Sequence, residues 1–163
     1  MDLAAILRLG HALAGVAFMA GIIGNWVVVG FARRASSLEA MHLYLRASRP
    51  FGVLLTGGGI TLTVLGIATA FSLGRPLFGP LSGGSVDWLF VSNVLMLPIF
   101  LALVLVYPRV GRRIRAALED ADRRGSLTPE LAIAWADPRL RAARTYEAAA
   151  VTVVLALMIA KPF

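Results

Sequence analysis

The stretch "LRLGHALAGVAFMAGIIGNW", residues 7–26, decides the fold, because it is apolar over the thickness of a lipid bilayer. A helix needs about 20 mostly apolar residues to cross the hydrocarbon core. The stretch also carries one histidine, His11, and small residues at alternating spacings of three and four: Gly10, Ala14, Ala17, Gly21 and Gly24. It therefore predicts a membrane-spanning helix with a small-residue face and a polar group in the bilayer.

Three more apolar runs follow in the 163-residue chain, which is 58% hydrophobic and only 15% charged. A soluble domain is about 25% charged. The four predicted spans are residues 3–31, 51–73, 88–107 and 140–160. Residues 109–137 between the last two spans form an amphipathic cytoplasmic segment. We therefore expect an all-α fold, an integral membrane four-helix bundle, with residues 1–163 as a single transmembrane domain.

The net charge of +7 is placed asymmetrically. Of the 16 basic residues, 13 lie in two segments, residues 32–50 and 108–145. Loops rich in Lys and Arg stay in the cytoplasm, so this pattern predicts cytoplasmic basic loops and both termini outside. The basic segments are expected to contact anionic lipid headgroups. Nucleic-acid binding is not expected, because no aromatic residues are interleaved as a base-stacking surface requires.

The second span carries its own row of small residues at the same alternating spacings. In lipid, helices associate through close backbone approach at small residues, because no water-driven force brings them together. The first two spans are therefore expected to form a tight antiparallel pair, the first through the small residues given above. Those of the second span are Gly52, Thr56, Gly59, Thr63 and Gly66.

His11 is the candidate ligand, since an ionisable group inside a membrane normally faces protein rather than lipid. Imidazole is an axial ligand of haem iron, and a methionine sulfur can occupy the opposite position. Met96 or Met158 would supply that sulfur, with Asn93 at the same depth, and Gly15 would leave room for a flat macrocycle. A His/Met set also suits copper, which makes His11 a candidate metal ligand.

A structural role for His11 is the alternative. A neutral histidine can bridge helices by hydrogen bonds, here to Asn93, Ser72 or Thr69. The chain has no cysteine, no Gly-rich phosphate loop, no nucleophile elbow and no metal-binding His pair. No catalytic residues are therefore assigned, and the sequence favours a protein that is not an enzyme.

Several motifs resemble a bacterial family of predicted integral membrane proteins that carry a domain of unknown function. They are the early histidine in "LRLGHALAGVAFMAG", the basic "FARR" at the end of the first span, the second-span sequence "RPFGVLLTGGGITLTVLG", the "PRVGRRIRAAL" that follows the third span and the terminal "LALMIAKP". The resemblance covers nearly the whole chain. It implies a multi-pass protein of the bacterial inner (cytoplasmic) membrane.

That family resembles, more distantly, the copper-resistance-D-like membrane bundles. These include a haem-binding oxidase of porphyrin biosynthesis, whose first-helix histidine ligand matches His11. The oxidase also relies on a lysine in its third helix, and residues 88–107 contain none. The resemblance therefore leaves haem binding open without implying porphyrinogen oxidation.

Three interpretations of the function follow. The first is a non-enzymatic accessory or assembly subunit, whose partners are the lipid bilayer and other membrane proteins or a second copy of itself. The second is a haem b-binding bundle that uses His11 as axial ligand, for redox chemistry or haem handling. The third is copper handling through His11 and methionines.

Overall fold

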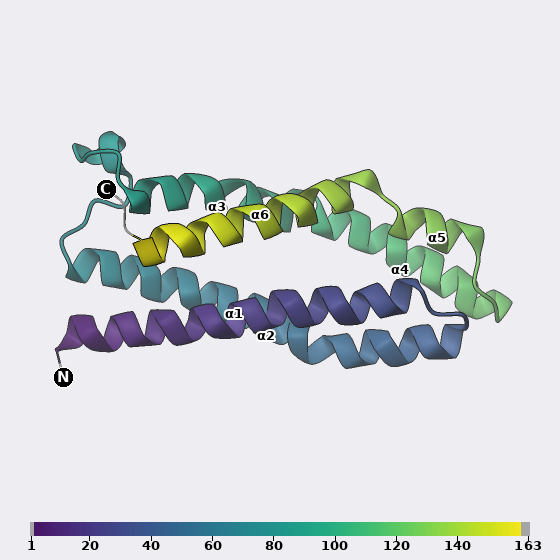
Figure 1. Cartoon of the computed structure of the whole chain (residues 1–163). Coiled ribbons are helices and arrows are strands. Elements are labelled where there is room, and N and C mark those ends of the chain that lie inside the picture. Colours follow the sequence, from purple (N-terminus) through teal and green to yellow (C-terminus); the bar gives the residue numbers. More distant parts are fainter. Residues whose placement is uncertain (1, 161–163) are drawn as a thin grey trace. The chain divides into compact units, whose positions relative to one another are not determined.

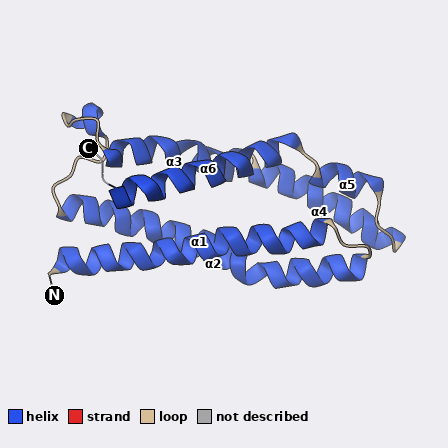
Figure 2. Ribbon diagram, in the orientation of Figure 1, coloured by secondary structure: helices blue, strands red, loops and turns tan. Residues whose placement is uncertain are grey.

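The structure, a computed structural model, describes residues 2–160 and contains helices and loops but no strand in that range (Figure 2). The main helices are α1 (Leu3–Arg33), α2 (Leu38–Ser72), α3 (Trp88–Leu105), α4 (Tyr107–Arg124), α5 (Pro129–Trp135) and α6 (Pro138–Ala160), and a short 3₁₀ helix covers Gly79–Ser82. The all-α prediction is confirmed.

Four helical segments are long and apolar enough to cross a membrane, as predicted. They are Leu3–Arg33, Leu38–Ser72, Trp88–Arg124 and Pro129–Ala160, and the last two each include more than one helix. The chain divides into two compact units, residues 1–75 with α1 and α2, and residues 76–163 with the remaining helices. The single domain spanning residues 1–163 stays a prediction.

The first unit is a helical hairpin in which α1 and α2 run antiparallel, side by side (Figure 1). The turn between them ends at Ser37, whose hydroxyl oxygen accepts a hydrogen bond from the Ala40 N–H over 3.2 Å. Such a cap satisfies one of the free N–H groups of the first helical turn. α2 then continues without interruption through Pro50. The connection before residue 51 is thus helical and continuous with the second span, whose predicted start at residue 51 stays a prediction.

Small residues bring the α1 and α2 backbones together. A Cβ atom added at Gly21 would lie 2.8 Å from Leu55 Cα, and one added at Gly58 would lie 2.9 Å from Phe18 N. Neither position can carry a side chain unless the helices separate. Close backbone approach therefore holds the hairpin, as the packing of helices in lipid requires.

The face of α2 that packs against α1 differs in part from the predicted row of small residues. Gly59 and Gly66 face side chains of α1, whereas a Cβ at Gly52 would meet nothing within 4 Å. Gly58, which the predicted row omits, lies against the α1 backbone instead. Gly52 is thus wrong as a packing residue of this hairpin, because successive residues of a helix point about 100° apart and only some of the α2 glycines face α1.

In the second unit, α3 and α6 run antiparallel, side by side (Figure 1). α4 follows α3 directly, and Gly125 ends it with a positive φ of 68°. α6 begins at Pro138, and the Asp137 carboxylate accepts a hydrogen bond from the Arg139 N–H over 2.8 Å. The amphipathic segment predicted between residues 109 and 137 is thus two helices, α4 and α5, joined by a short turn.

Candidate functional site

His11 lies on α1 and reaches the backbone of α2. Its Nδ1 atom is 3.0 Å from the carbonyl oxygen of Leu62. A carbonyl oxygen can only accept, so Nδ1–H is the donor. In the neutral ring this leaves Nε2 with a free lone pair, because only one nitrogen carries a proton.

Gly66 makes this contact possible in two ways. A Cβ atom at Gly66 would lie 2.9 Å from His11 Cε1, so the imidazole occupies the space that a side chain would take. Within α2 the Leu62 carbonyl also belongs to the helical turn that ends at Gly66. A carbonyl has two lone pairs, and the missing side chain leaves the second one open to His11.

The hydroxyl groups predicted as partners of His11 bond elsewhere in α2. The Thr69 hydroxyl donates to Leu65 O over 2.7 Å, and the Ser72 hydroxyl donates to Thr69 O over 2.8 Å. Thr69 and Ser72 are therefore wrong as partners of His11. Hydroxyls in a helix readily bond to a backbone carbonyl of the preceding turn, and here these local bonds engage them.

Asn93, Met96 and Met158 belong to the second unit. Asn93 is exposed at the start of α3, and its amide nitrogen donates to Leu77 O over 2.8 Å, which ties α3 to the preceding loop. Met96 on α3 and Met158 on α6 are half-buried. Their role opposite His11 stays a prediction.

The surroundings of Gly15 differ from the open space expected for a macrocycle. A Cβ at Gly15 would be in ordinary contact with Leu62 Cδ1, at 3.6 Å. The Leu62 side chain therefore occupies the place beside Gly15. Within residues 2–160, no group of three or more His, Cys, Asp or Glu side chains is arranged to hold a metal ion.

A second polar site lies in the other unit. Glu147 on α6 is only 5% exposed, and its carboxylate accepts a hydrogen bond from the Tyr107 hydroxyl over 2.8 Å. Arg144, one turn earlier on α6, lies near enough for its charge to act on the carboxylate. A buried carboxylate needs such partners, since desolvation of an isolated charge is very costly.

The signal for this pair was present in the sequence, because Tyr107 and Glu147 each lie near the basic end of a predicted span. A second tyrosine completes the link between the helices: the Tyr146 hydroxyl donates to Leu95 O over 2.9 Å. The two bonds cross from α3 and the start of α4 to α6. They fix the spacing of these helices.

A groove of about 430 Å³ runs between α3 and α6. Pro98, Leu101, Ala102 and Leu105 line it from α3, and Ala142 and Ala143 line it from α6. Arg139 lies at the start of α6 and also lines the groove. The groove is thus apolar, with the positively charged side chain of Arg139 at one end.

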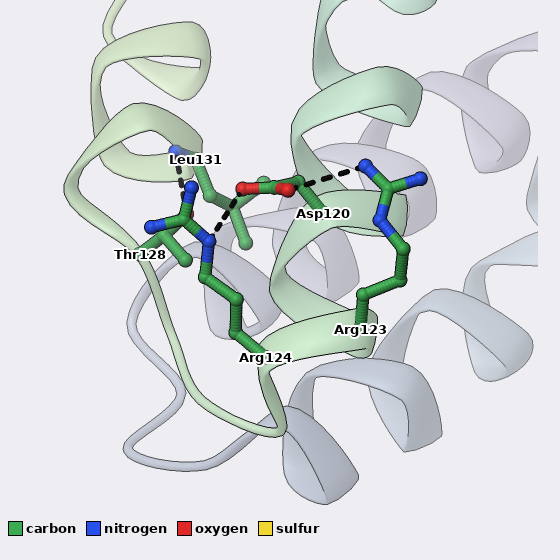
Figure 3. Close-up of polar contacts among 5 residues, drawn as sticks. All are labelled: Asp120, Arg123, Arg124, Thr128 and Leu131. Atoms are coloured by element: carbon green, nitrogen blue, oxygen red, sulfur yellow. Dashed lines mark hydrogen bonds and ion pairs between the residues drawn. The ribbon is translucent and has the colours of Figure 1, made fainter.

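Acidic side chains neutralise part of the basic segment that follows α3. Asp120 pairs with Arg124 at 2.9 Å and with Arg123 at 3.2 Å, beside the turn in which the Thr128 hydroxyl oxygen accepts from the Leu131 N–H (Figure 3). Exposed pairs of this kind contribute little stability, about 0–1 kcal/mol. They do, however, reduce the charge that these arginines offer to other anions.

The comparisons with known proteins bear on the class of the protein. A family model described as "Predicted integral membrane protein (DUF2269)" matches residues 5–162. The chain belongs to this family. No curated protein and no solved structure matches it significantly. The DUF2269 match confirms the resemblance to an integral membrane family with a domain of unknown function. The more distant likeness to copper-resistance-D-like bundles stays a prediction.

Proposed function

We propose that this DUF2269 protein is a non-enzymatic accessory or assembly subunit of a larger complex in the bacterial inner membrane. Its basic segments would lie in the cytoplasm and both termini outside. The observation that carries the proposal is the exposure of the outer face of α2. None of the residues in the most hydrophobic 18-residue window of this helix is buried.

One row of α2 residues, here called the α2 ridge, points away from α1. Its members are spaced alternately by four and three residues: Val53, Gly57, Ile60, Val64, Ile67 and Phe71. The two ends are the most exposed, with Val53 at 71% and Phe71 at 72%. A Cβ at Gly57, within the ridge, would meet nothing within 4 Å.

This spacing and the bare glycine support a further helix as the partner of the ridge, and the proposal takes that helix from another protein. A seam of residues spaced by three and four is typical of helices that pack along their length. Lipid chains need no glycine in order to cover an apolar helix, whereas a second helix approaches closely only where side chains are small. The ridge thus offers one open glycine, Gly57, between large apolar side chains along the helix.

The test is native gel electrophoresis of native membranes solubilised in mild detergent. We expect the wild-type chain in one discrete assembly larger than the purified chain. Gly57→Leu should release it, because the new side chain blocks close approach. Gly111→Leu is the matched control, since Gly111 is exposed on α4 and also has nothing within 4 Å. A wild-type chain that migrates alone, or an assembly that Gly57→Leu leaves intact, contradicts the proposal.

A second candidate function, haem b binding for redox chemistry or haem handling, is favoured by the bond from His11 to Leu62 O. Histidine ligands of metals commonly donate their other N–H to a carbonyl, which fixes the ring and leaves the second nitrogen for the metal. His11 has this arrangement, with Nδ1 held by the protein. The fit is incomplete, because the Leu62 side chain fills the space beside Gly15.

An optical spectrum tests this second candidate. Protein purified from its own membranes should show a Soret band that His11→Ala abolishes if His11 binds haem. A flat spectrum in both proteins contradicts haem binding and leaves the hydrogen bond as the role of His11. Copper handling is the third candidate, and metal analysis of the same preparation should find copper that His11→Ala removes.

A further inference from the structure

We propose that the α3–α6 groove is a phospholipid site, in which one acyl chain lies along the groove and the anionic headgroup pairs with Arg139. The walls suit an acyl chain. Apart from Arg139, the groove is lined by aliphatic side chains, by two tyrosines and by the almost fully buried Glu147. Its volume of about 430 Å³ lies within the range of small-molecule sites, about 300–1,000 Å³.

The groove is already formed without a ligand. Both lining tyrosines bond across to the opposite helix, Tyr107 to Glu147 and Tyr146 to Leu95 O. Ala142 and Ala143, one turn before these bonds on α6, line the open space with small side chains. Binding therefore requires no rearrangement of the helices, which lowers the cost of binding.

The groove extends along the membrane-spanning part of the unit. From Pro98 to Leu105 it follows about 10 Å of α3, at 1.5 Å per residue. Because α3 and α6 run antiparallel, the start of α6 lies at the end of the groove near Val106 (Figure 1). Arg139 therefore marks the end at which a headgroup would lie, and the acyl chain would point toward Pro98.

Arg139 is the arginine that lines the groove, and its guanidinium is free to bind an anion. Among residues 2–160, no side-chain or backbone group pairs with its guanidinium. By contrast, Arg113 pairs with Asp137 at 3.5 Å, and Arg123 and Arg124 pair with Asp120. A phosphate complements a guanidinium in charge and geometry. Basic pockets between membrane helices bind anionic headgroups in the same way.

Native mass spectrometry of the full chain in detergent tests the proposal, with dioleoyl-phosphatidylglycerol and dioleoyl-phosphatidylcholine as probes. We expect one phosphatidylglycerol to bind about fivefold more tightly than phosphatidylcholine, the effect of about one arginine at a headgroup. Arg139→Gln should abolish this preference. Arg141→Gln is the matched control, because Arg141 is exposed on α6 but does not line the groove.

A second pair of variants tests the acyl chain. Ala142→Phe fills the groove from an exposed position and should weaken the binding of both lipids, whereas Ala149→Phe, exposed on α6 but outside the groove, should not. Equal losses with Arg139→Gln and Arg141→Gln would mean diffuse attraction to a basic surface. Unchanged binding in Ala142→Phe, or a lipid-free wild-type dimer that Ala142→Phe dissociates, would likewise overturn the proposal.

Discussion

A single methyl group at Gly21 should loosen the α1–α2 hairpin. The Cβ atom of Gly21→Ala would lie 2.8 Å from Leu55 Cα and 2.9 Å from Leu54 C, and closer still to Leu55 N. All three atoms are backbone, so no side chain can rotate away. Relief requires the two helices to separate by at least about 0.6 Å, the difference between the 2.8 Å to Leu55 Cα and the 3.4 Å at which ordinary contact begins.

The expected cost is about 1–3 kcal/mol, the range for an extra methylene in a well-packed core. The separation also weakens the neighbouring contacts, such as that of Gly58 with the Phe18 backbone. The greater helix propensity of alanine acts in the opposite direction by about 1 kcal/mol. Gly30→Ala measures the gain in helix propensity alone, because a Cβ at Gly30, also on α1, would meet nothing within 4 Å.

The assay is equilibrium unfolding of the purified chain in dodecylmaltoside by added SDS. Trp26 on α1 reports the hairpin by fluorescence when Trp88 and Trp135 are replaced by Phe. We expect Gly21→Ala to lower the free energy of unfolding and Gly30→Ala to leave it unchanged or raise it. Equal stability of the two variants would refute close packing at Gly21 as the source of hairpin stability.

Three further variants test single interactions. Tyr107→Phe should destabilise the second unit by about 1–3 kcal/mol in thermal unfolding, because the buried Glu147 loses its donor; a variant as stable as wild type would contradict that bond. Thr128→Ala should cost about 1 kcal/mol by removing the cap of α5; an unchanged circular dichroism spectrum and melting temperature would contradict that role. Gly66→Ala should displace the His11 ring, and ¹⁵N NMR should then show a mixture of imidazole tautomers in place of Nδ1–H alone.

The helices were predictable because their signals are local. Apolar length fixes the spans, and caps such as Asp137 before Pro138 or Gly125 after α4 fix the ends. The continuity of α2 through Pro50 was not predicted. Inside a helix, proline removes one hydrogen bond and its ring clashes with the carbonyl of the preceding turn, so Pro50 favours a helix boundary that the structure does not have.

The partners of polar groups were predicted less well. His11 was placed correctly as a group that faces protein, but its partner is a backbone carbonyl, and every residue has one. Only the axial register of α1 on α2 selects Leu62. Likewise, Tyr107 meets Glu147 only after α3 and α6 are aligned, a contact over 40 residues of sequence.

The register itself follows from large side chains packed on glycines. His11 and Phe18 are seven residues apart on α1, and Gly66 and Gly59 are seven residues apart on α2. A Cβ at Gly66 would meet the His11 ring at 2.9 Å, and one at Gly59 would meet the Phe18 ring at 3.2 Å. His11 thus occupies a packing position equivalent to that of an aromatic residue, and its Nδ1–H adds a hydrogen bond that phenylalanine lacks. Packing alone would therefore be satisfied by Phe at position 11, so the imidazole nitrogens are what histidine adds there.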